Sequence, residues 1–173
     1  MKMLMLFASA MLLVMAGVTV ARADERPLPL ESFFRNPEKM GFQISPDGTR
    51  ILYLAPWERR LNVHVQTIGE DSAVRVTSAT ERDIIACLWS GNDRIVYLQD
   101  KGGDENYHLF SAKADGSGAR DLTPFDGVRT TIVDPLEEKD DEMLVGLNRR
   151  DPTVFDVYRL NLDSGELSLV EEN

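Results

Sequence analysis

Few residues in this chain could do nucleophilic or metal chemistry: two histidines, His64 and His108, and one cysteine, Cys87. Cys87 lies in the apolar run 84–89, which is typical of a strand and contains no histidine. A reactive thiol needs a neighbouring base or positive charge, so we expect a buried, inert thiol here. Both histidines have apolar neighbours in strand-like runs, and we expect structural roles for them. Because a zinc site needs three or four clustered ligands, we predict no metal site and no cofactor.

Charged residues in two stretches offer a second kind of chemistry, the binding of a charged substrate. Asp100, Asp104 and Glu105 flank two glycines ahead of a strand-like run. This loop is either a solvated turn or a surface that contacts substrate, and its spacing does not fit a calcium-binding EF-hand. Arg149 and Arg150 form either an exposed loop or a contact for a substrate carboxylate. The candidate substrate-binding residues are therefore Asp104, Glu105 and Arg149, and we identify no catalytic residue.

A sequence repeat organises the elements that would position these residues. The runs Ser45–Leu54 and Ser90–Leu98 both pass from a serine through a turn to Arg-Ile-x-Tyr-Leu, and their isoleucines lie 44 positions apart. A turn and a short apolar strand that recur at such a period are typical of a β-propeller. A third, less regular unit follows. We predict blades at about residues 40–80, 84–125 and 128–173.

The predicted fold class is all-β, with about three four-stranded antiparallel blades of an incomplete β-propeller. A propeller closes a ring of about four to eight blades. An open array would leave apolar blade faces and unpaired strand edges uncovered. We therefore expect the front part of a longer protein, a truncated product, or a protomer that completes the ring with other copies. The oligomeric state and the total number of blades are left open.

The amino terminus is typical of an exported protein. Residues 1–23 fit a signal peptide, because Lys2 precedes a long uncharged run and Ala21-Arg22-Ala23 fits the cleavage pattern. An uncleaved membrane anchor is the alternative. Cleavage would leave a lead-in segment at residues 24–39, with one helical turn near residues 30–34. We predict a periplasmic or secreted protein.

The net charge of −10 argues against partners that need a basic surface. Without Lys2 and Arg22 the 19 basic residues fall to 17 against 29 acidic ones, so that the net charge is −12. Nucleic acids and anionic membranes both attract basic proteins. We predict no nucleic-acid partner and no stable membrane association after signal cleavage.

Three stretches resemble one enzyme family. The run Leu98–Phe110, Leu-Gln-Asp-Lys-Gly-Gly-Asp-Glu-Asn-Tyr-His-Leu-Phe, is similar to a stretch in the propellers of the prolyl oligopeptidase family. The nearest resemblance is to bacterial exported acylaminoacyl-peptidases and dipeptidyl-peptidases. Arg120–Val128 and Val145–Pro152 resemble the same family further along. The resemblance implies a two-part serine peptidase, in which a propeller covers an α/β-hydrolase domain and limits access to peptides.

The chain departs from that family in its catalytic machinery. It contains no Gly-x-Ser-x-Gly elbow, and Gly116-Ser117-Gly118 has the wrong spacing for one. The nucleophilic serine, aspartate and histidine would therefore belong to a missing α/β-hydrolase domain beyond Asn173, through which the chain would meet its peptide substrate. In the family's arrangement, carboxylates such as Asp104 and Glu105 could face the peptidase cavity and hold a peptide amino terminus.

Two functions are consistent with these residues. The first is the propeller, or substrate-gating, portion of an exported serine peptidase that cleaves peptides, itself without the catalytic triad. The alternative is an exported β-propeller module that binds a protein partner and has no enzymatic activity. A nucleophile elbow downstream of the propeller would favour the first, and a propeller that closes and then stops would favour the second.

Overall fold

The computed structural model describes residues 28–34 and 37–173, so the signal peptide predicted at residues 1–23 lies outside the described residues. The chain divides into two units, Met1–Asn36 and Pro37–Asn173. In the first unit, α2 (Glu31–Phe34) is a single helical turn, as predicted near residues 30–34. Within the described ranges, no helix combines the length and the apolar character that crossing a membrane requires.

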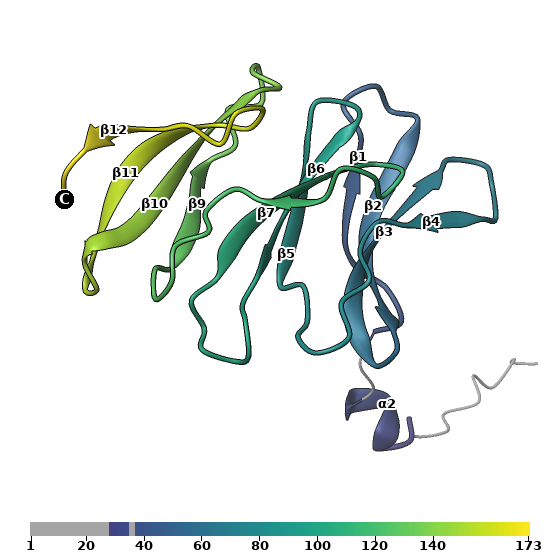
Figure 1. Cartoon of the computed structure of the whole chain (residues 1–173). Helices are drawn as coiled ribbons and strands as arrows, with labels where there is room; N and C mark the ends of the chain where they lie inside the picture. Colours follow the sequence, from purple (N-terminus) through teal and green to yellow (C-terminus); the bar gives the residue numbers. More distant parts are fainter. Residues whose placement is uncertain (1–27, 35–36) are drawn as a thin grey trace, which may run out of the picture. The chain divides into compact units, whose positions relative to one another are not determined.

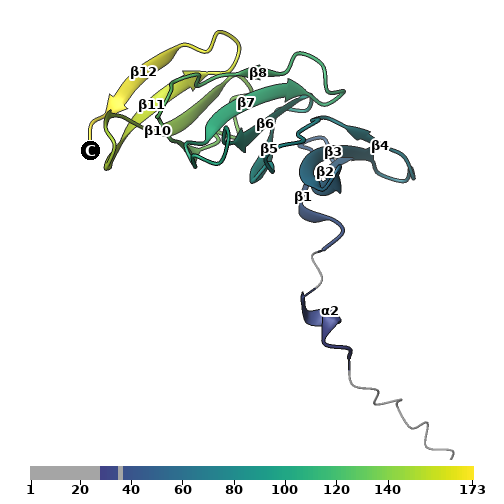
Figure 2. The same cartoon turned by 60° about the horizontal axis from the view of Figure 1, so that its bottom comes forward.

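The second unit consists of three four-stranded antiparallel sheets, which follow one another along the chain (Figures 1 and 2). This confirms the predicted all-β fold. Blade 1 contains β1 (Met40–Ile44), β2 (Arg50–Trp57), β3 (Arg60–Thr67) and β4 (Ala73–Arg75). Blade 2 contains β5 (Ala86–Ser90), β6 (Arg94–Gln99), β7 (His108–Lys113) and β8 (Arg120–Asp121). Blade 3 contains β9 (Thr130–Asp134), β10 (Glu142–Asp151), β11 (Val154–Asn161) and β12 (Leu167–Glu171).

The turn between β1 and β2 is held by its own side chains. The Asp47 carboxylate accepts hydrogen bonds from the Ser45 hydroxyl at 2.6 Å and from the Thr49 backbone N–H at 3.0 Å. These donors, the serine first, lower the pKa of Asp47 to about 2. Gly48 has a φ of 73°, which an L-residue rarely adopts, so glycine closes the turn without strain. The turn predicted from Ser45 to Gly48 therefore follows from local chemistry.

Two strands are longer than the sequence indicates. β2 continues through Pro56 to Trp57 and returns into β3 through Glu58 and Arg59, whose φ angles are 48° and 69°. Such two-residue hairpin turns usually contain asparagine or glycine, so the turn carries no recognisable signal. In blade 3, β10 extends to Asp151, so Arg149 lies within a strand and not in the exposed loop that its charge suggested.

Both faces of blade 2 are buried against its neighbours. Ile95 and Val96 are adjacent in β6 and fully buried, yet they belong to different apolar clusters. Ile95 packs in the cluster that includes Leu52 of blade 1, and Val96 packs in the cluster that includes Met143 of blade 3. Successive strand residues point to opposite faces of a sheet, so an uninterrupted apolar strand joins two blades.

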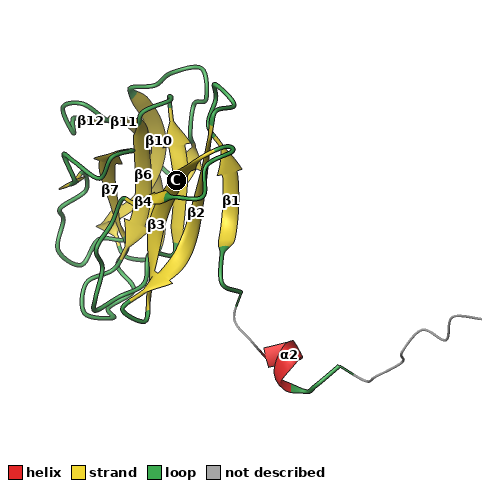
Figure 3. Ribbon diagram, turned by 90° about the vertical axis from the view of Figure 1, so that its right-hand side faces the viewer, coloured by secondary structure: helices red, strands yellow, loops and turns green. Residues whose placement is uncertain are grey.

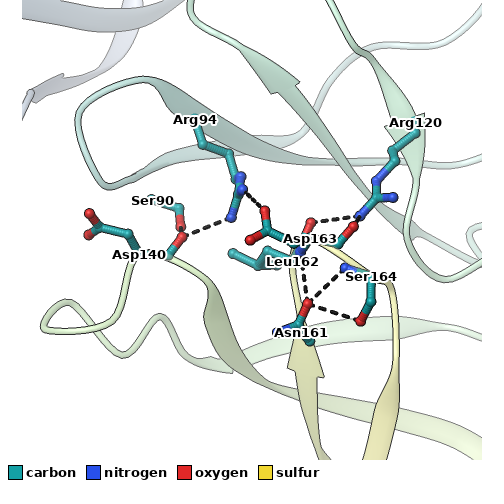
Figure 4. Close-up of polar contacts among 8 residues, drawn as sticks. All are labelled: Ser90, Arg94, Arg120, Asp140, Asn161, Leu162, Asp163 and Ser164. Carbon is teal, nitrogen blue, oxygen red and sulfur yellow. Dashed lines mark hydrogen bonds and ion pairs between the residues drawn. The ribbon is translucent and has the colours of Figure 1, made fainter.

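Arginines at the start of β2 and β6 complete the contacts between the blades. Arg50 donates to the backbone carbonyl of Asn92 in the next blade, and its guanidinium lies 3.6 Å from the Asp93 carboxylate. Arg94 repeats this arrangement: it donates to the Asp140 carbonyl at 2.8 Å and pairs with Asp163 (Figure 4). We call Arg50 and Arg94 the joint arginines. They occupy the same position of the sequence repeat.

Each blade has two ends with different surroundings. We call the end at which β1, β5 and β9 begin the proximal end, and the end at which they finish the distal end. Because neighbouring strands are antiparallel, the loops 100–107 and 122–129 belong to the proximal end, and the turns 45–49, 91–93 and 135–141 belong to the distal end. Figure 3 shows the strands running between these two sets of loops.

Candidate functional site

The loop that follows β6 at the proximal end is anchored by a buried ion pair. The Asp100 side chain is 1% exposed, and its carboxylate accepts a hydrogen bond from Nε of Arg82 at 2.9 Å. This bond is the main reason that the pKa of Asp100 lies below its usual range. The Arg82 carbonyl in turn accepts from the Gln99 side chain at 3.0 Å. A carboxylate is buried in this way only when a charged partner compensates its lost hydration.

A histidine–carboxylate pair lies beside the first pair, on β7 and β8. Nδ1 of His108 lies 2.7 Å from the Asp121 carboxylate. The His108 ring also stacks on Phe110, with 6.3 Å between ring centroids, and Phe110 stacks on Tyr97 at 5.3 Å. Peptidase triads contain such a histidine–carboxylate pair next to a nucleophile. None of the hydrogen bonds of the described chain joins His108 to a serine or cysteine, so the pair orients the ring and organises the surface.

Both pairs contribute to one proximal cavity of about 380 Å³. Phe110 forms an apolar part of its wall, and the charged groups around it are mostly acidic. Once Arg82 is assigned to Asp100, the remaining carboxylates outnumber the cationic groups, so the cavity suits a ligand with positive charge or several donors. Its charged and polar lining residues are Glu81, Arg82, Gln99, Asp100, Lys101, His108, Asp121 and Asp126.

The predicted substrate-binding residues do not line this cavity. Asp104 and Glu105 are exposed in the same loop, and the Asp104 carboxylate accepts from the Asn106 backbone N–H at 3.0 Å. Arg149 is exposed in β10, and its guanidinium lies 4.6 Å from the ring centroid of Phe125. Substrate binding by Asp104, Glu105 and Arg149 stays a prediction. The Arg82 partner of Asp100 escaped sequence analysis because it lies 18 positions away in the connection between blades.

The remaining candidates occupy structural positions. Cys87 is buried, and burial raises the pKa of its thiol to about 12. The His64 ring stacks on Tyr53, with centroids 5.6 Å apart, and desolvation lowers its pKa. Ser117 lies in the distal turn after β7, where its backbone N–H donates to Asp115 at 2.8 Å. Among the described residues, no group of three histidine, cysteine or acidic side chains is placed to hold a metal ion.

The chain is similar in sequence and in fold to known peptidases. No protein-family model matches it. It is 37% identical over 145 residues to dipeptidyl aminopeptidase BIII of Pseudoxanthomonas mexicana, a match that covers 83% of this chain and 21% of that enzyme. Among solved structures, acylaminoacyl peptidase in complex with Z-Gly-Gly-Phe-chloromethyl ketone matches with a TM-score of 0.58 and 16% identity, over 80% of this chain and 26% of that one.

The sequence match supports a propeller portion of a prolyl oligopeptidase-family peptidase. The resemblance predicted from the run Leu98–Phe110 is thereby confirmed. The putative TolB of Agrobacterium tumefaciens has a similar fold, with a TM-score of 0.57 and 16% identity over 77% of this chain and 50% of that one. At such identities the structural matches show the propeller fold alone. The chain spans about a fifth of the length of the curated relatives it matches, 21% in each case.

Proposed function

We propose that this chain is the substrate-gating propeller portion of an exported serine peptidase that cleaves peptides. The observation that carries the proposal is the 37% identity to a dipeptidyl aminopeptidase over most of the chain. The catalytic serine, aspartate and histidine would come from an α/β-hydrolase domain, because the described residues contain no site that unites these groups. The propeller would limit which peptides reach that domain.

The proximal end is the part of the propeller that we assign to the peptide path. Its cavity holds an excess of carboxylates beside the Phe110 ring. A peptide amino group is cationic at neutral pH and is attracted to such a surface. The exposed carboxylates of Asp104 and Glu105 lie in the adjoining loop and would extend the same field. The gate would then favour peptides with a free amino terminus over large folded proteins.

Export is the second part of the proposal. It is supported by the resemblance of residues 1–23 to a signal peptide. The protein would act in the periplasm or outside the cell as a chain that begins at Asp24. Amino-terminal sequencing of the native product tests this assignment, and a product that still begins at Met1 would contradict it.

One experiment tests the peptidase proposal. An antibody raised against residues 37–173 is used on the exported fraction, together with a fluorophosphonate probe that labels active serine hydrolases. We expect an immunoreactive band well above 19.4 kDa that takes the probe. The recombinant chain, which should stay unlabelled, is the control. An unlabelled native band at the size of the chain would refute the peptidase proposal and favour the binding module.

A further inference from the structure

A second, larger cavity lies at the distal end, away from the Arg82–Asp100 and His108–Asp121 pairs of the proximal site. It has a volume of about 690 Å³ and is lined by residues of the first strands of all three blades and of the turns that follow them. We call it the distal groove. Its wall includes Ile44, which is 65% exposed, together with the partly buried Leu88, Ile132 and Leu136. Water in contact with such a wall is displaced favourably by apolar groups of a ligand.

One polar group in the wall of the distal groove lacks a partner. Trp89 lines the groove and is 8% exposed, and its indole N–H finds no acceptor among the residues that the structure describes. A buried donor without an acceptor destabilises the folded chain, because it has lost its hydrogen bonds to water. Such groups are rare in folded proteins and call for an explanation. A ligand whose acceptor reaches this buried nitrogen would supply the missing hydrogen bond.

The strands that border the groove also have a free side. β1, β5 and β9 are edge strands of their sheets, so one side of each backbone is not paired with a neighbouring strand. The backbone carbonyl of Cys87 in β5 accepts a hydrogen bond from the Gln43 side chain of the preceding blade at 2.9 Å. An edge strand is a template for an extended chain, which pairs its own backbone with the unpaired groups.

We propose that the distal groove binds an extended peptide segment with apolar side chains. The apolar wall would receive the side chains, and a peptide carbonyl would accept from the Trp89 indole. A lipid or another purely apolar ligand would leave that donor unpaired, and a highly charged ligand would lose hydration against the wall. Glu137 and Lys139, of opposite charge, also line the groove and suit a backbone that carries no net charge. The inference rests on the proposed function, because it names the peptides that the propeller would select.

Trp89 itself serves as the reporter in the test. The chain has two tryptophans, so the Trp57→Phe variant leaves one indole N–H signal in the ¹H–¹⁵N spectrum. The probe is the blocked peptide acetyl-Gly-Leu-Ala-Leu-Gly-amide, and the matched peptide replaces both leucines by serine. We expect a saturable downfield shift of the indole signal with the leucine peptide. The serine peptide should bind at least about tenfold more weakly, because it lacks the apolar side chains that leucine buries against the groove wall.

A groove variant and a matched control make the test specific. Leu136 has a φ of 50°, and asparagine tolerates this conformation, so Leu136→Asn removes the apolar side chain without disturbing the turn. It should weaken leucine-peptide binding about tenfold. Leu169→Asn changes a leucine of β12 that is 49% exposed and should leave binding within about twofold. An unshifted indole signal, equal binding of both peptides, or no effect of Leu136→Asn would each overturn the inference.

The design separates this inference from the peptidase proposal. The peptides are blocked at both ends, and the assay uses the chain itself, so no hydrolase domain is needed for binding. If the native product takes the fluorophosphonate probe but the leucine peptide does not shift the Trp89 indole signal, the inference fails and the peptidase proposal stands. If the groove binds the leucine peptide while the native product is unlabelled, the inference stands and the chain is a peptide-binding module.

Discussion

Replacing Asn62 should destabilise the chain strongly, because this side chain joins β3 to the connection toward blade 2. Asn62 is fully buried. Its amide nitrogen donates to the carbonyls of Arg60 and Ala79, each at 3.0 Å. Its amide oxygen accepts from the Thr77 hydroxyl at 2.9 Å and from the Ala79 backbone N–H at 2.7 Å. Asn62→Leu keeps the branched shape of the side chain and removes all of these hydrogen bonds.

The magnitude follows from the groups that the substitution leaves behind. The Thr77 hydroxyl and the Ala79 N–H lose their acceptor, and a buried donor without a partner costs about 1–3 kcal/mol. Thr77 is buried, whereas Ala79 is partly buried and can reach water. The greater apolar area of leucine offsets part of the loss. We therefore expect the free energy of unfolding to fall by about 3 kcal/mol, a large share of the roughly 5–15 kcal/mol that stabilises a domain.

Urea unfolding at neutral pH, followed by near-ultraviolet circular dichroism, measures this change. Asn106→Leu is the matched control, because the hydrogen bond of the Asn106 side chain goes to Asp104, at 3.3 Å, within the proximal loop. The control should change the free energy of unfolding by less than about 0.5 kcal/mol. If Asn62→Leu is no more destabilising than Asn106→Leu, the reasoning from buried hydrogen bonds is wrong.

Three further predictions concern the joint, the proximal site and the thiol. Arg94→Met should accelerate amide hydrogen exchange in residues 135–141, because Arg94 holds this turn of blade 3; unchanged exchange would contradict it. Arg82→Met should lower the urea midpoint at pH 7, because Arg82 keeps the folded-state pKa of Asp100 below its unfolded value. The difference from the parent chain should shrink as the pH falls below about 4 and disappear only below the lowered folded-state pKa, where Asp100 is protonated in both chains. A midpoint difference that does not vary with pH would oppose this. Cys87 should resist iodoacetamide at about pH 8 until urea unfolds the chain, because burial raises its pKa to about 12; rapid native labelling would refute it.

Local chemistry explains why the sequence predicts the blades well. The turn at Asp47 depends on side chains within two positions, so its residues can be recognised without knowing the fold. The first two units of the repeat both end in a threonine, and this similarity also has a physical basis. Thr77 and Thr123 follow the fourth strands, and their hydroxyls accept from the N–H groups of Val63 and Leu109, both at 2.9 Å. The threonine that recurs at this position of the sequence repeat therefore makes the same hydrogen bond in both blades.

The candidate site was less predictable, because its contacts join residues that no local pattern connects. The carboxylate of Asp100 was recognised as part of a polar loop, but its burial depends on Arg82 in the preceding connection. The charge of Arg149 makes it a candidate for substrate binding. The structure places its guanidinium over the ring of Phe125, which lies in the connection between blades 2 and 3. The cavity and the distal groove depend on how neighbouring blades pack. That packing follows from apolar faces that many side-chain arrangements would satisfy.

Blade 3 has no arginine at the start of its second strand, the position from which the joint arginines of blades 1 and 2 contact the following blade. Arg50 and Arg94 start the second strands of blades 1 and 2, and both reach the following blade. The second strand of blade 3 starts instead with Glu142, which pairs within its own blade with Lys139 at 2.8 Å and Arg159 at 2.7 Å. The hydrogen bonds from these two residues lower the pKa of Glu142, so the carboxylate stays ionised and engaged. In this chain, the arginine at this position therefore joins blades 1 and 2 to the blade that follows each of them, whereas the glutamate of blade 3 stabilises its own sheet.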